Sequence, residues 1–192
     1  MKKFFWILIA SLAVAGSACS KPPSPPPEML RPATIKDIMD SMVDPSGDFM
    51  FESVVQIADE KGVREKAPKT PKEWAEVRQH VFTLIEAPNL LVMEGRKVAQ
   101  TGEKAENPNV ELQPEQIQKL IDDDRPAFFR RARRLQDAAA QALKAVDVRD
   151  KDALFVAIDK IDHACENCHL HYWYPNDKRA KEAAKEEGMV VD

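Results

Sequence analysis

Apolar residues recur at spacings of three and four along most of the chain after residue 33, the period of amphipathic α-helices. The first helix is predicted to start at Thr34, a favourable N-cap, with Asp37 in its first turn. Its apolar face contains Ile35, Ile38, Met39 and Met42. Pro45 interrupts the pattern, so we expect either a kink or a new helix from Ser46. The restarted helix would carry Phe49, Val54, Ile57 and Ala58.

A second helix is predicted from the sequence Thr70-Pro71-Lys72-Glu73, which combines a capping box with proline at the first helical position. Pro88 predicts a kink near Glu86, and Gly102 is the expected C-cap. Residues 61–69 and 103–112 flank this helix and are interpreted as loops. Its buried face should contain Trp74, Val77, Val81, Leu84, Leu91 and Val92.

A third helical region is predicted from about Pro114 and is divided by Pro126. We expect a short helix to about Asp122, then either a kink or a restart capped by Asp124. The last helix should begin after Asp150 and end before Pro175. The helical segment after Pro126 has an apolar seam of Phe128, Ala132, Leu135, Ala139, Ala142 and Val146. The last helix has a seam of Leu154, Ile158, Ile161, Cys165 and Cys168.

Both seams alternate spacings of four and three, which is typical of helix bundles. The charged tail, residues 178–192, is expected to be a surface helix or a frayed end. No stretch shows strand alternation, an internal repeat or a glycine-rich phosphate loop. The pattern therefore predicts an all-α domain over residues 34–177.

The N-terminal residues 1–18 have the composition of a secretory signal peptide. Lys2 and Lys3 precede an apolar run, and small residues lead into Cys19. This arrangement resembles a bacterial lipoprotein box, in which Cys19 is lipidated and becomes the mature N-terminus. The box has Gly16 where leucine is usual, and cleavage nearby that leaves a spare thiol is the alternative. Ser20 after the lipidated cysteine is typical of outer-membrane sorting in a Gram-negative cell.

Residues 19–33 form a proline-rich segment, which should be an extended tether that holds the domain away from a membrane. Removal of residues 1–18 lowers the formal net charge of the 192-residue chain from −4 to −6. An acidic chain argues against nucleic acid as a partner, because such binding depends on neutralising phosphates.

The most specific motif is Cys165-Glu166-Asn167-Cys168-His169, which has the C-x-x-C-H spacing of covalent haem attachment. Two thiols add to the two vinyl groups of a haem, and the adjacent histidine offers a nitrogen to the iron. A disulfide, a zinc site or a chance match are the alternatives. With lipid on Cys19 and one haem on Cys165 and Cys168, every cysteine of the chain is used.

Four amphipathic helical regions with this motif near the C-terminus resemble the class II cytochromes c, the group of cytochrome c-prime and its low-spin relatives. The resemblance covers about residues 34–177 and implies an up-down-up-down four-helix bundle with one haem c in its core. It implies His169 as the axial iron ligand. Low-spin relatives take a methionine of the first helix as the sixth ligand, which points to Met39, with Met42 as the alternative or an open site as a third option.

The remaining candidate side chains have less specific signals. His171 and His163 are displaced around the helix from His169 and cannot oppose it on one iron. His80 is expected to have a structural role, with haem ligation as the alternative. Arg130, Arg131, Arg133 and Arg134 are expected to form a solvated face, with a haem-propionate contact by one of them as the alternative. Trp173 and its neighbouring tyrosines should pack near the haem edge.

The resemblance implies a periplasmic, membrane-anchored electron carrier that exchanges electrons with an unidentified redox protein. No catalytic group is identifiable, so we do not expect an enzyme. A gas-binding protein for nitric oxide or carbon monoxide, with an open sixth site, is the first alternative. An accessory haem lipoprotein of a larger redox complex is the second. Related bundles often pair through their first two helices, so the resemblance also implies a homodimer.

Overall fold

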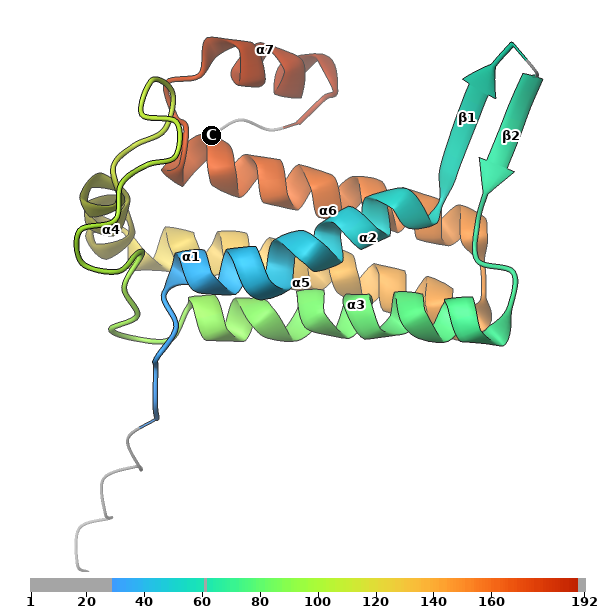
Figure 1. Cartoon of the computed structure of the whole chain (residues 1–192), viewed down its shortest axis with the longest axis horizontal. Helices are drawn as coiled ribbons and strands as arrows, with labels where there is room; N and C mark the ends of the chain where they lie inside the picture. Colours follow the sequence, from blue (N-terminus) through green and yellow to red (C-terminus); the bar gives the residue numbers. More distant parts are fainter. Residues whose placement is uncertain (1–28, 61, 190–192) are drawn as a thin grey trace, which may run out of the picture. The chain divides into compact units, whose positions relative to one another are not determined.

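The computed structural model describes residues 29–60 and 62–189, and this part of the chain is mostly helical, as the periodicity predicts (Figure 1). The chain divides into two units, residues 1–30 and 31–192. All described helices and strands belong to the second unit. They are α1 (Ile35–Ile38), the π-helix η1 (Met39–Val43), α2 (Asp44–Ser53), β1 (Val55–Asp59), β2 (Gly62–Lys66), α3 (Pro71–Leu91), α4 (Pro114–Asp123), α5 (Arg125–Val148), α6 (Lys151–Tyr172) and α7 (Lys178–Glu186).

The predicted helix starts are confirmed by their capping hydrogen bonds. Thr70 Oγ1 accepts from the backbone of Glu73 at 3.2 Å, and the Glu73 carboxylate accepts from the Thr70 backbone at 2.8 Å. Thr34 and Asp37 form the same reciprocal capping box at α1. Asp124 and Asp150 accept from backbone N–H groups at the starts of α5 and α6. Each bond satisfies a donor that the first helical turn leaves unpaired.

Pro45 neither ends the first helical segment nor leaves it as a plain α-helix. The chain stays helical from α1 to α2, with the π-helix η1 directly before the proline. In an α-helix the ring of Pro45 would meet the carbonyl of Ser41, and its missing N–H would leave that carbonyl unpaired. The wider π turn, closed by the Asp44 N–H on the Met39 carbonyl, accommodates this residue within a continuous helix.

The helix expected to reach Ala58 ends at Ser53, so this prediction was wrong, as was the loop expected over residues 61–69. Val54 is extended, and β1 pairs antiparallel with β2, with Val55 opposite Lys66 and Asp59 opposite Gly62. The β-branched residues Val54, Val55 and Ile57 favour extended backbone. Gly62 supplies the positive φ of 106° at the turn. Ile57 is exposed, so its apolar character does not mark a core position.

The C-terminus predicted for α3 at Gly102 was also wrong, because α3 continues through Pro88 and ends at Leu91. Buried Arg96 ends the helix: its Nε donates to the Leu90 carbonyl at 2.6 Å, and its Nη1 donates to the Ala33 carbonyl. One guanidinium therefore satisfies a helix-end carbonyl and ties the following loop to the start of α1. The expected loop over residues 103–112 is confirmed.

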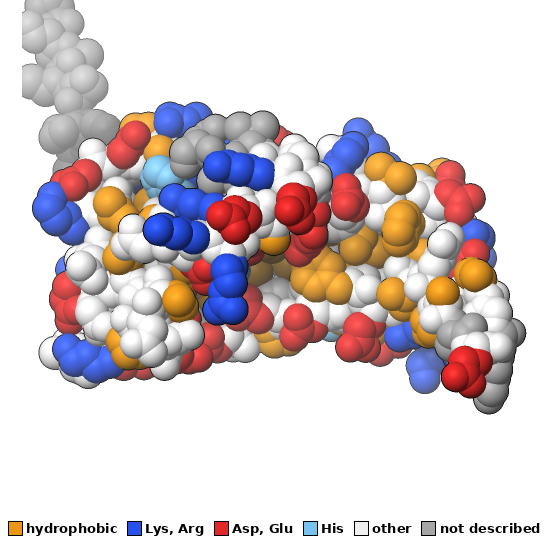
Figure 2. All heavy atoms as spheres, turned by 90° about the horizontal axis from the view of Figure 1, so that it is seen from above, with side chains coloured by type: hydrophobic (Ala, Val, Ile, Leu, Met, Phe, Trp, Pro, Cys, Tyr) orange, Lys and Arg blue, Asp and Glu red, His pale blue; other side chains and the backbone are white. Residues whose placement is uncertain are grey.

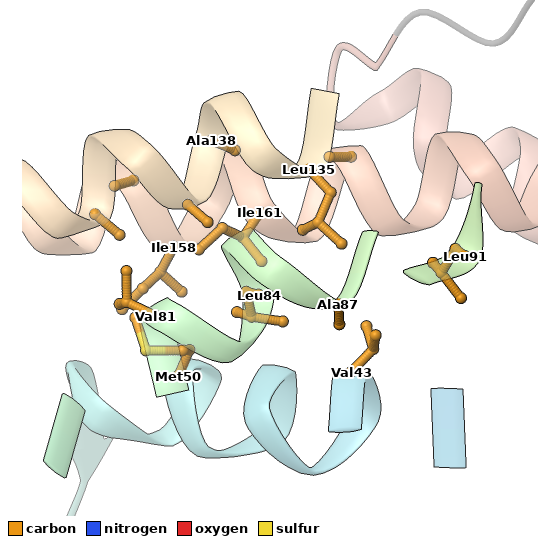
Figure 3. Packing of buried hydrophobic residues seen from close by; sticks show 14 of the residues in the cluster. Val43, Met50, Val81, Leu84, Ala87, Leu91, Leu135, Ala138, Ile158 and Ile161 are labelled. Carbon is orange, nitrogen blue, oxygen red and sulfur yellow. The ribbon is translucent and has the colours of Figure 1, made fainter. Parts of the chain in front are cut away.

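The core lies between α2, α3, α5 and α6, which run side by side in alternating directions (Figure 1). Contacts join α2 to α3, α3 to α5, α5 to α6, and α6 back to α2. Figure 3 shows Val43 and Met50 facing Leu84 and Ala87, with Leu135 and Ile161 on the opposite side. The six seam residues predicted on α5 are all buried. On α6, Leu154, Ile158 and Ile161 are buried, while Cys165 and Cys168 are partly buried against the same cluster.

The face of the molecule shown in Figure 2 carries charges of both signs with apolar side chains between them. The tail expected as a surface helix or frayed end contains α7, of which Ala184 is buried. No helix in the described ranges has the length and apolar character that crossing a bilayer would demand.

We expect Ile161→Ala to lower the free energy of unfolding by about 2–5 kcal/mol, because it opens a cavity in a fully buried site. Val156→Ala on the same helix, whose side chain is half exposed, should change it by less than about 0.5 kcal/mol. Urea denaturation followed by far-UV circular dichroism measures both. Equal losses in the two variants would contradict the burial of Ile161 in the core.

Candidate functional site

A cavity of about 280 Å³ lies where η1, α5 and α6 meet the connection between α3 and α4. Its volume is close to the lower end of the range of small-molecule sites, roughly 300–1,000 Å³. Three of the sequence-predicted residues, Cys165, Cys168 and His169, line it from α6. Met39 lines it from η1, whereas Met42 does not. The tertiary structure thus brings together residues that are about 130 positions apart in the chain.

The two thiols are both free and partly buried. Burial raises the pKa of Cys165 to about 12 and that of Cys168 to about 11. The nearby Arg131 guanidinium opposes the shift in the pKa of Cys168. Both sulfurs are therefore neutral thiols at pH 7, and thiolate, the reactive form in alkylation, is scarce.

His169 is in the last turn of α6 and is held by the local backbone. Its carbonyl accepts from the N–H groups of Trp173 at 2.7 Å and Tyr174 at 3.0 Å. The rings of these two residues lie 6.4 and 5.9 Å from the imidazole, between centroids. Burial lowers the pKa of His169, and the neighbouring Asp44 carboxylate partly opposes this effect. The imidazole is therefore neutral, which is the form that binds metal ions.

Met39 and Met42 share one face in an ideal α-helix pattern, but they do not share one environment. Both are partly buried, and both lie in the π-helix that precedes Pro45. A π turn holds more residues than an α turn, so side chains along it rotate away from the positions that a 3.6-residue period predicts. In this geometry only Met39 reaches the cavity that contains His169.

The connection between α3 and α4 covers one side of the cavity, a role that its polar sequence did not indicate. Lys36 N–H donates to the Val98 carbonyl at 2.9 Å, and Leu112 N–H donates to the Trp173 carbonyl at 2.8 Å. These bonds tie the connection to α1 and to the end of α6. Val98, fully buried, and Leu112 both line the cavity. Val98 and Leu112 are apolar residues within a polar segment, and this was the signal that could have predicted the contact of the connection with the cavity.

Charged groups also line the cavity and lock the same connection to α1. Lys36 Nζ donates to Asp40 and to Glu106, each at 2.7 Å. These two bonds raise the pKa of Lys36, Asp40 contributing most, so the lysine stays charged. As Lys36 is partly exposed, we assign these ion pairs a positional role rather than a large stabilising one.

One arginine of the cluster is buried, although the sequence favoured a solvent-exposed position for all four. Arg131 is buried and lines the cavity, whereas Arg130 and Arg133 are exposed. Arg134 is also exposed by residue, and its Nη1 donates to Asn167 at 2.8 Å. Arg131 follows Phe128 by three residues and precedes Leu135 by four, so it falls on the apolar seam of α5. That spacing was the available signal for its burial.

The other histidines lie away from the cavity lining. His80 stacks on Phe49 with ring centroids 4.0 Å apart, and its Nδ1 lies 3.3 Å from Ser46 Oγ. His171 Nδ1 lies 3.1 Å from Arg131 Nη2. His163 Nε2 lies 3.8 Å from Asp159. Trp173, Tyr172 and Tyr174 all line the cavity.

Comparisons with protein-family models, curated proteins and solved structures found no match. Among residues 29–60 and 62–189, no three His, Cys, Asp or Glu side chains converge as a metal site. The predicted signal peptide, the lipidation site Cys19 and residues 19–28 of the tether lie outside the described residues.

Thiol labelling tests the environment of the cavity. In a haem-free Cys19→Ser chain, we expect iodoacetamide at pH 8 to modify Cys165 and Cys168 on the order of 100-fold more slowly than in urea. The reason is the raised pKa of both thiols, and the native rate should keep rising with pH beyond the usual thiol range. Mass spectrometry of quenched samples measures it. Equal rates with and without urea would show that the thiols are exposed.

Proposed function

We propose that the chain is a c-type cytochrome that carries one haem in this cavity and transfers electrons. The observation that carries the proposal is that Cys165, Cys168 and His169 line one cavity together with Met39. The attachment motif alone indicates haem chemistry. Its residues border a largely apolar cavity, and a methionine from a distant helix borders the same cavity.

The helical arrangement supports the finer proposal of a four-helix bundle of the class II cytochrome c type. The contacts among α2, α3, α5 and α6 close into a ring, and successive members of that ring alternate in direction. Bundles of this kind build cofactor sites from side chains on facing helices. Here α6 would supply the attachment residues, and η1 would supply the group on the other side of the cofactor.

The residues of the cavity fit a haem in three respects. Cys165 and Cys168 are free thiols that would hold the haem through one thioether bond each. His169 is neutral and offers a ring nitrogen. The lining beyond them is mostly apolar and includes Leu135 and Ile117. A bound haem supplies one-electron redox chemistry, while the chain binds it, orients it and excludes water.

We propose Met39 as the sixth ligand in preference to Met42 and to an open site. A thioether ligand raises the reduction potential and fills the coordination position that a gas molecule would need. This favours electron transfer over gas binding. The N-terminal signal, the lipid on Cys19 and the tether would place such a carrier at the periplasmic surface of a membrane, where it meets a protein redox partner.

Absorption spectra of the purified mature protein test this function. We expect low-spin haem spectra in both oxidation states, no change on adding carbon monoxide, and the weak long-wavelength band of methionine-ligated ferric haem. Met39→Ala should abolish that band and permit carbon monoxide binding. Met42→Ala is the matched control, one turn away on the same segment, and should retain the wild-type spectra.

The contrary outcomes have distinct meanings. A high-spin wild-type spectrum that responds at once to carbon monoxide would reject Met39 as a ligand and favour the gas-binding function. Loss of the long-wavelength band in Met42→Ala alone would transfer the ligand assignment to that residue. Absence of haem from the wild-type protein would refute the proposed function as a whole.

A further inference from the structure

The cavity wall formed by α5 and α6 contains two buried polar atoms that lack a partner. They are Nε of Arg131 and the hydroxyl oxygen of Tyr172, and both residues line the cavity. We propose that Arg131 and Tyr172 together form a binding site for a carboxylate group that enters with the ligand of the cavity. The inference rests on the proposed function in one respect, since it assigns this carboxylate to a propionate side chain of the haem.

Arg131 is a buried cation without an anion. The residue is 7% exposed, and the only hydrogen-bonding neighbour of its guanidinium within the described chain is His171, at 3.1 Å from Nη2. None of the ion pairs formed by the described residues includes it. A buried charge is costly unless it is paired and hydrogen-bonded. Arg131 therefore needs an acceptor that the described chain does not supply.

Tyr172 presents a second donor at the same wall. The residue is 1% exposed, and its ring packs edge-on against Phe128 with centroids 5.4 Å apart. The Arg131 guanidinium carbon lies 5.7 Å from the centre of the tyrosine ring. Burial raises the pKa of Tyr172 to about 12, so the phenol keeps its proton and can donate it in a hydrogen bond. Buried tyrosine hydroxyls ordinarily have such a partner.

The pair favours a carboxylate over other ligand groups. A carboxylate accepts several hydrogen bonds and brings the negative charge that Arg131 lacks, and arginine–carboxylate bonds are among the strongest in proteins. A neutral carbonyl would leave the guanidinium charge uncompensated. The neighbouring lining residues Phe128, Ala132 and Leu135 are apolar, so the ligand must join its carboxylate to an apolar body. A haem has this composition, and so has a small free carboxylic acid.

Carbon-13 labelling of the haem carboxylates tests the assignment directly. The spectra would be recorded on the reduced protein saturated with carbon monoxide. The ferrous iron is then diamagnetic whether its sixth ligand is methionine or carbon monoxide. We expect two propionate signals in the wild type. Tyr172→Phe removes one oxygen atom and keeps the ring, and Arg131→Lys keeps the charge but removes Nε. Both variants should shift the same propionate signal and leave the other in place.

Arg130→Lys is the matched control, because Arg130 precedes Arg131 on α5 but is exposed. It should shift neither signal. A second series adds carbon-13-labelled acetate to protein with unlabelled haem, and we expect no saturable change in the acetate signal.

Each alternative result decides a separate question. If the propionate signals are the same in all variants, and labelled acetate is bound in a saturable way that Tyr172→Phe abolishes, the carboxylate site stands with a free acid as its occupant. If neither label responds to Tyr172→Phe or Arg131→Lys, the site is refuted. A pyridine haemochrome assay measures the haem content of the wild-type protein and so tests the proposed function separately. If the wild type contains no haem, the proposed function is refuted, but the acetate series still tests the carboxylate site.

Discussion

Burial of one face of α6 is the constraint on which the core and the cavity both depend. Leu154, Ile158 and Ile161 occupy that face, and their spacing continues without a break into Cys165 and Cys168. Residues spaced by three and four positions share one face of a helix, so the two cysteines point to the same side of α6 as the buried residues. Cys165 and Cys168 therefore lie against the core as a consequence of the packing that stabilises it. Space for a ligand exists there because the adjacent wall residues Ala132 and Ala164 are small.

The end of the helical core that contains the cavity, where α1 begins and α3 and α6 end, is closed by backbone and by a few polar side chains rather than by another long helix. Arg96 ends α3 and holds the following segment against Ala33, and Leu112 joins that segment to Trp173. Lys36 connects α1 to Glu106 across the same region. These bonds explain how a polar connection without regular structure holds Val98 and Leu112 against the cavity. The site thus combines a helical wall with a hydrogen-bonded cover.

The electrostatics of the cavity follow from the degree of burial of each group. Low solvation keeps the thiols of Cys165 and Cys168 and the imidazole of His169 in their neutral forms. Arg131 cannot adopt a neutral form under the same conditions, since its guanidinium stays protonated. Arg131 is therefore the charged group of this wall that needs an anionic partner from outside the chain. This distinction between groups that can neutralise and one that cannot underlies the proposed carboxylate site.

The periodicity and capping residues of the sequence determined most of the helices by themselves. The caps at Thr34, Thr70, Asp124 and Asp150 act within one helical turn, so local sequence is sufficient to place them. The buried seams of α5 and α6 could also be predicted from the sequence, because a helix face must be apolar over several turns to be buried. The hairpin was missed since its β-branched residues also fitted a helical spacing, and short apolar runs are ambiguous.

Tertiary structure decided which of the residues predicted from the sequence lie together in the candidate site. The end of α3 depends on Arg96, whose partners include Ala33, 63 residues away. The π-helix before Pro45 separates Met39 from Met42, which an ideal helix places on one face. The burial of Arg131 had a signal in its spacing, but the absence of a hydrogen-bond partner for its Nε depends on every neighbouring element. Local interactions are encoded in adjacent residues, whereas a cavity is defined by side chains from segments that only the folded chain brings together.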